Sequence, residues 1–169
     1  VLEPQIGAEY ISRLLNIYHH EGVPIGTGSN FDASKQYSKH ALFYWEKMFK
    51  DIIIQPRPLA IDLLDLSIKN EKGRTIIIAL GPLSNIAELL EKYPENAMKI
   101  ETILWYCNFS DKPDGYNFKQ NIKAYEYIIK SKIPLKIISG SELTYMEDFL
   151  LICDEINSVY AKTLFDFFA

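Results

Sequence analysis

The feature that most constrains the fold is a change of hydrophobic pattern in the middle of the chain. Residues 75–80 form a short, β-branched apolar run, which is typical of a buried strand. Gly81-Pro82 ends this run, and over residues 83–92 apolar side chains recur at helical spacing. The pattern predicts a buried strand, a tight turn and an amphipathic helix, which together make half of a βαβ unit. Because doubly wound sheets bind ligands beyond the carboxyl ends of their strands, residues 80–85 are expected to line a ligand crevice, although periodicity alone also fits an ordinary strand-to-helix connection.

Strand-like and helix-like segments alternate along most of the chain. Apolar runs at residues 100–107 and 135–138 predict two further buried strands, and residues 118–131 between them predict a helix. This alternation implies right-handed crossovers and a mostly parallel sheet. The predicted class is therefore α/β, a mostly parallel sheet with helices on both faces, followed by a helical C-terminal part after Gly140. The remaining predicted elements are helices at 4–21, 38–49, 59–68, 144–153 and 155–168, and a short strand at 23–25.

Composition limits the number of domains and the class of partner. With 169 residues, of which 48% are hydrophobic, residues 1–169 are expected to form a single domain with a sizeable core. The net charge of −4 comes from interspersed acidic and basic residues, which argues against a nucleic-acid partner. No apolar run reaches the roughly 18 residues of a membrane span, so no membrane partner is expected. Cys107 and Cys153 lie in apolar segments and are predicted to be buried free thiols. A homo-oligomer and the cellular location stay open.

A short motif at the predicted turn resembles that of a known family. Residues 79–87, Ala-Leu-Gly-Pro-Leu-Ser-Asn-Ile-Ala, are similar to the Ala-Leu-Gly-Pro-Leu-Thr-Asn-Ile-Ala segment of the nucleoside hydrolases, the inosine-uridine-preferring N-ribohydrolase family. Residues 116–134 follow a later signature of that family in the same register, and residues 8–28 resemble its helix before an Ile-Pro-Ile-Gly strand. The resemblance covers roughly residues 5–138. It implies a Rossmann-related nucleoside hydrolase fold, of which this chain, lacking an initiator Met, is expected to be the middle portion.

The resemblance implies an activity, a cofactor and three site residues. Nucleoside hydrolases cleave the N-glycosidic bond of ribonucleosides with a water activated by calcium, so calcium and a small ribonucleoside substrate are implied. The backbone carbonyl of Leu80 stands where the family has a metal ligand, and plain strand core is an equal alternative for this residue. Asn117 matches the asparagine that hydrogen-bonds the sugar hydroxyls, and a helix cap is its equal alternative. Trp105 replaces the Met of the family's Met-Gly-Gly strand end and is expected to bind substrate.

The chain departs from the family in its carboxylates and in the glycines of that strand end. The family's calcium is held mainly by an Asp-X-Asp-X-X-X-Asp-Asp motif, and this chain contains no Asp-X-Asp, so no catalytic residue is assigned. Gly115 stands where the family has a glutamate, and Tyr106 and Cys107 are expected to fill part of the ribose space. The alternatives are a catalytically inactive binding or assembly domain on the same scaffold, and an unrelated doubly wound domain.

Histidines and one pair of aspartates supply the other candidate groups. His19 and His20 end a predicted helix, where a cationic ring favours the helix dipole, so capping is the preferred interpretation. His40 is predicted to be exposed on a polar helix. Asp62 and Asp65 are three residues apart among apolar helix positions and are predicted to lie on a solvated polar face rather than to form a catalytic pair.

Overall fold

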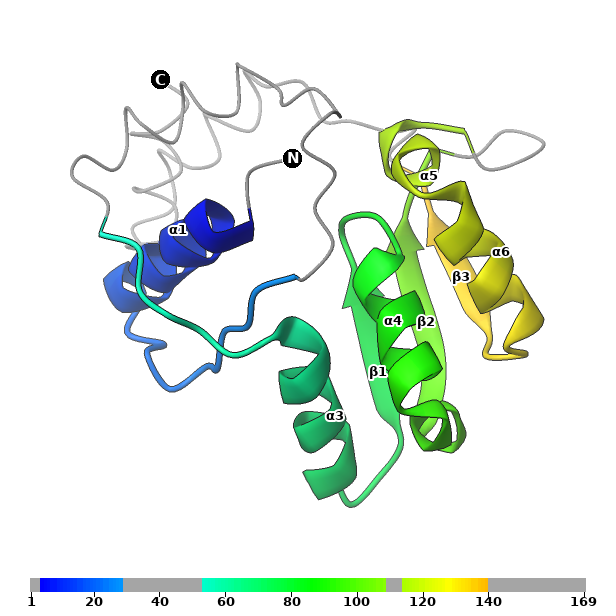
Figure 1. Cartoon of the computed structure of the whole chain (residues 1–169), viewed down its shortest axis with the longest axis horizontal. Helices are drawn as coiled ribbons and strands as arrows, with labels where there is room; N and C mark the ends of the chain where they lie inside the picture. The colour runs from blue at the N-terminus through cyan, green and yellow to red at the C-terminus, as the bar shows by residue number, and fades with distance from the viewer. Residues whose placement is uncertain (1–3, 29–52, 109–113, 140–169) are drawn as a thin grey trace, which may run out of the picture. The chain divides into compact units, whose positions relative to one another are not determined.

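The computed structural model describes residues 4–28, 53–108 and 114–139. The chain divides into two compact units, and each is described by itself. One unit contains helix α1, and the other contains the sheet with the remaining described helices (Figure 1). The single domain expected over residues 1–169 stays a prediction. The predicted helices that lie outside the described residues are 38–49, which carries His40, 144–153, which carries Cys153, and 155–168.

The C-terminal end of helix α1 is capped by a backbone hydrogen bond. It spans Pro4–Ile17, with proline in the first turn, where no backbone N–H is required. His19 adopts a left-handed conformation with φ of 57°, and the backbone N–H of His20 donates to the carbonyl of Leu15 at 2.7 Å. This bond satisfies a carbonyl of the last helical turn. The helix therefore ends before the two histidines, which were predicted to form its last turn.

The second unit is built on a three-stranded parallel sheet in the order β1-β2-β3 (Figure 1). The strands are β1 Thr75–Ala79, β2 Ile100–Tyr106 and β3 Leu135–Ile138. Ala79 is in register with Trp105, and Trp105 with Ile137. The carboxyl ends of the strands therefore meet at one edge of the sheet, as the alternation of strands and helices predicts.

The predicted strand at residues 23–25 is wrong. The chain instead forms one isolated parallel bridge, between Thr27 and Leu59. In this bridge Thr27 N–H donates to the carbonyl of Pro58 at 2.9 Å, and Ala60 N–H donates to the carbonyl of Thr27 at 2.7 Å. Pro58 has no N–H to donate the preceding bond of such a ladder, so the bridge does not extend back into a regular strand pair.

Helices pack beside the sheet and beside one another. They are α3 Ala60–Asn70, α4 Ser84–Lys92, the short 3₁₀ helix η1 Pro94–Met98, α5 Tyr116–Gln120 and α6 Ile122–Lys130. Helix α4 contacts both α3 and α6, and it lies against the sheet in Figure 1. Among the helices of the described ranges, none combines the length and apolarity that a membrane crossing requires.

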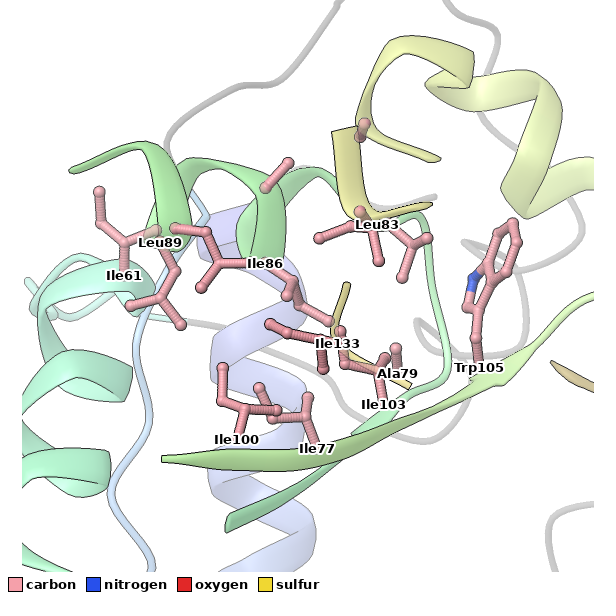
Figure 2. Close-up of a cluster of buried hydrophobic side chains, with 14 of the residues drawn as sticks. Ile61, Ile77, Ala79, Leu83, Ile86, Leu89, Ile100, Ile103, Trp105 and Ile133 are labelled. Atoms are coloured by element: carbon pink, nitrogen blue, oxygen red, sulfur yellow. The ribbon is translucent and has the colours of Figure 1, made fainter. Parts of the chain in front are cut away.

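The core of this unit joins β1 and β2 to α4. Ile77 and Ala79 of β1 and Ile103 of β2 pack in one cluster with the apolar side of α4 (Figure 2). The four positions that predicted this side of the helix are all buried, which confirms the helical spacing: Leu83, Ile86, Ala87 and Leu90. The turn at Gly81-Pro82 thus follows a strand whose Ile77 and Ala79 are buried and whose Ile76 and Ile78 are exposed, and it precedes a helix with a buried apolar side.

Two aspartates tie α3 to neighbouring elements. Asp62 accepts hydrogen bonds from Lys92 Nζ at 2.7 Å and from the Tyr93 hydroxyl at 2.8 Å, and the lysine bond is the main reason that the pKa of Asp62 lies below its usual value. Asp65 accepts from Asn96 Nδ2 at 2.9 Å, and its side chain is only 13% exposed. The Asp65 side chain is therefore largely covered rather than solvated, because Asn96 of η1 and Lys69 of α3 both bond to it.

Candidate functional site

The candidate site lies at the carboxyl ends of β1 and β2. Leu80 follows β1, Tyr106 ends β2, and the turn into α4 begins at Gly81. Helix α5 starts after Gly115 and brings Asn117 to the same place. In an open α/β sheet this edge is where ligands bind. The sheet topology places residues 80–85 at this edge, and their predicted role in lining a ligand crevice stays a prediction.

Asn117 bridges the ends of the two strands. Its side-chain Nδ2 donates to the carbonyl of Leu80 at 3.1 Å and to the carbonyl of Tyr106 at 2.9 Å. Since both acceptors are carbonyl oxygens, they fix which end of the amide is the nitrogen. Two of the predicted site residues, Leu80 and Asn117, are thus in direct contact although 37 positions separate them in the sequence. Within the described ranges both of these bonds use the amide nitrogen, and the Oδ1 of the same side chain is an acceptor.

Trp105 supports the turn from within the core. Its side chain is fully buried, and the indole N–H donates to the carbonyl of Gly81 at 3.0 Å. The indole also stacks on Tyr125 with ring centroids 5.7 Å apart. Figure 2 shows the Trp105 side chain at one end of the buried cluster. The structure therefore shows Trp105 holding the turn, and the contact with substrate expected for Trp105 stays a prediction.

Tyr106 and Cys107 differ in how they meet solvent. Tyr106, at the end of β2, is 41% exposed. Leu80, directly after β1, is 75% exposed. Cys107 is buried, which confirms the predicted buried thiol, and burial raises its pKa. The thiol donates to the carbonyl of Asn108 at 3.4 Å. Tyr106 and Leu80 are therefore the side chains of these strand ends that a ligand would meet first.

A break at Asn121 divides the single helix predicted over residues 118–131 into α5 and α6. Asn121 has a φ of −154°, and its Oδ1 accepts from the backbone N–H of Ala124 at 3.0 Å, which caps α6. Its Nδ2 donates to Ser84 Oγ at 2.9 Å and so links the starts of α6 and α4. The sequence did not indicate the bond between Asn121 and Ser84, because no local pattern points to a partner 37 residues away.

The described residues do not fit calcium. Calcium takes about six to eight oxygen ligands at about 2.3–2.6 Å, several of them carboxylates. Within the described ranges no group of three or more His, Cys, Asp or Glu residues is placed to hold a metal. The candidate carbonyl ligand, that of Leu80, already accepts from Asn117. Asp62 and Asp65 cannot complete such a site, since they bond to residues after the far end of α4.

A pocket, called the α4–α6 groove below, lies on the same unit. It has a volume of about 400 Å³ and is lined mainly by the two helices. Three acidic and two basic side chains line it. Its charged lining residues are Glu88, Glu91, Lys123, Glu126 and Lys130.

Known structures share this fold. No protein-family model matches the sequence, and no curated protein matches it significantly. A plant nucleoside hydrolase is similar, with a TM-score of 0.76 and 17% identity over 98% of this chain and 57% of its own. A purine-preferring ribonucleoside hydrolase from Gardnerella vaginalis has a TM-score of 0.70 and 21% identity over 96% of this chain and 58% of its own. An inosine-uridine preferring nucleoside hydrolase from Bacillus anthracis has a TM-score of 0.69 and 16% identity over 99% of this chain and 62% of its own.

These similarities establish the fold. The chain has the α/β fold of nucleoside hydrolases, so the fold that residues 79–87 led us to expect is confirmed. At this level of identity the relationship is a divergent one. The chain spans about three fifths of the length of these enzymes.

Proposed function

We propose that this chain, which has the nucleoside hydrolase fold, is part of a ribonucleoside N-ribohydrolase. In the proposed reaction water adds to the anomeric carbon of ribose, the bond between that carbon and the base nitrogen breaks, and the base leaves with a proton. The observation that carries the proposal is the agreement in fold, over 98% of the chain, with a plant nucleoside hydrolase. The meeting of Leu80 and Asn117 at the ligand-binding edge of the sheet supports it.

The described residues suit substrate binding better than bond cleavage. The Asn117 amide is anchored through its nitrogen, so its Oδ1 is held in place to accept a hydrogen bond from a ribose hydroxyl. The indole N–H of Trp105 keeps the neighbouring turn in position. No general acid or base is assigned among the described residues. Calcium, which the resemblance implies, would supply an activated water, but these residues do not form its ligand set and no step is assigned to it.

Release of ribose from ribonucleosides tests the proposal. The full chain is incubated with purine and pyrimidine ribonucleosides, with and without calcium, and free ribose is measured. We expect ribose release, and Asn117→Ala should lower kcat/KM by about 10- to 100-fold because a hydrogen bond to the sugar is lost. Glu126→Gln in the α4–α6 groove is the matched control and should leave kcat/KM unchanged. Circular dichroism checks that the protein is folded. If the folded protein releases ribose from none of the nucleosides, the proposed hydrolase activity is excluded.

An assembly domain on the same scaffold is the second candidate, and an apolar row favours it. Ile76 and Ile78 of β1 and Leu80 directly after it occupy alternate positions and are 52%, 65% and 75% exposed. Parallel sheets normally have both faces covered, so this row is suited to an interface. Association of copies that Ile78→Lys abolishes, measured by light scattering and found without any ribose release, would favour this candidate over the hydrolase.

A further inference from the structure

Three backbone carbonyls at the ends of β1 and β2 accept hydrogen bonds from neutral side chains. The carbonyls of Leu80 and Tyr106 both accept from Asn117 Nδ2, at 3.1 and 2.9 Å. The carbonyl of Gly81 accepts from the indole N–H of Trp105 at 3.0 Å. Neither donor carries a charge or titrates in the physiological range. These three carbonyls are called the carbonyl cluster below.

We infer that the Asn117 amide takes the place of a cation in the carbonyl cluster, so that the Leu80 carbonyl is not a calcium ligand in this chain. The carbonyl oxygens of Leu80 and Tyr106 are the negative ends of two peptide dipoles that parallel strands bring together. A positive group between them stabilises this arrangement. The two protons of one amide nitrogen supply it, because each points at one oxygen.

Calcium at the Leu80 carbonyl would compete with the Asn117 amide for the same oxygen. An ion at about 2.3–2.6 Å from the Leu80 oxygen would share that oxygen with Asn117 Nδ2, which lies 3.1 Å from it. The amide protons would repel the ion, and moving the side chain away would also free the Tyr106 carbonyl, since the same nitrogen bonds to both. The Gly81 carbonyl already accepts from Trp105, and the described residues offer no cluster of carboxylates in return.

Replacement of Asn117 by aspartate tests the inference. The side chain keeps its size, loses both N–H donors and places a negative charge against two carbonyl oxygens. We expect the Tm of the full chain in EGTA to fall by about 5 °C or more. Saturating calcium should then raise the Tm of Asn117→Asp more than that of the wild type, because the carboxylate creates a place for a cation. Asn117→Ala is the matched control, with a lower Tm and the same response to calcium as the wild type.

The difference between the two calcium responses decides the outcome. Each response is the Tm in calcium minus the Tm in EGTA, so a calcium site elsewhere in the protein contributes equally to both and cancels. A larger response in Asn117→Asp supports the inference. An equal response, or a larger one in the wild type, overturns it. The measurement does not depend on the proposed function, because neither arm involves a nucleoside or its hydrolysis.

A measurement on unsubstituted Asn117 covers the case in which Asn117→Asp fails to fold. In a Trp45→Phe background Trp105 is the only tryptophan, and its indole bonds to the residue beside Leu80. Terbium, which replaces calcium at oxygen sites, would emit light under tryptophan excitation if it were bound at the Leu80 carbonyl. We expect no terbium emission that decreases when calcium is added. Emission that falls as calcium is added would overturn the inference.

Discussion

Replacement of Trp105 by alanine is expected to lower the free energy of unfolding by about 4 kcal/mol. The side chain is fully buried and belongs to the main core cluster, so its removal leaves a large cavity. It also removes the N–H that satisfies the Gly81 carbonyl and the ring that stacks on Tyr125. Because the same turn leads into α4, loss of the indole weakens the connection between strand and helix as well as the core.

Urea unfolding of Trp105→Ala and Trp105→Phe measures this effect and divides it. Phenylalanine keeps most of the packing against Tyr125 but cannot donate to Gly81, so Trp105→Phe should lose about 1–2 kcal/mol. The difference in unfolding free energy between the two variants then measures the cost of the cavity. A loss below about 1 kcal/mol in Trp105→Ala, with a raised KM for a nucleoside, would contradict the structural role and return Trp105 to the substrate contact expected from the sequence.

Replacement of Gly26 by alanine is expected to lower the free energy of unfolding by about 2–3 kcal/mol. A Cβ at this position would lie 2.7 Å from the Ala60 Cα and 3.2 Å from the carbonyl oxygen of Pro58. Both are backbone atoms next to the bridge between Thr27 and Leu59, and they cannot turn aside as a flexible side chain can. The strain would therefore separate the bridge from the start of α3.

Gly73→Ala is the matched control for Gly26→Ala. An added Cβ at Gly73 meets no atom within 4 Å, and its backbone φ is not in the left-handed region. Thermal unfolding should show a lower Tm for Gly26→Ala and a Tm equal to or slightly above that of the wild type for Gly73→Ala, since alanine restricts the unfolded chain. Equal values for the two variants would show that the close approach at Gly26 is not maintained in solution.

The strand, turn and helix around Gly81 were predictable because several local signals agree there. A β-branched run, a Gly-Pro turn and helical spacing each point to the same elements, and the buried positions of α4 follow from that spacing alone. The strand at residues 23–25 was over-predicted for the opposite reason. Three residues that include a proline carry a weak pattern, and only a partner strand could have decided it.

The contacts of the candidate site were less predictable than its location. Sequence position and resemblance pointed to Leu80 and Asn117 separately, but the bond between them depends on how α5 packs over the strand ends. The burial of Asp65 depends in the same way on Asn96, which follows it by 31 residues. Side chains that bond across such separations leave no periodic signal, so their partners require the tertiary structure.

A ribonucleoside is expected to bind at the carboxyl ends of β1 and β2. The direct measurement is a titration of the ¹⁵N-labelled full chain with ribonucleoside, followed by NMR. We expect shifts in the side-chain amide signals of Asn117 together with the backbone amides of Gly81 and Cys107, which lie beside the carbonyl cluster. Shifts confined to the α4–α6 groove, with the Asn117 amide signals unchanged at saturation, would contradict the claim.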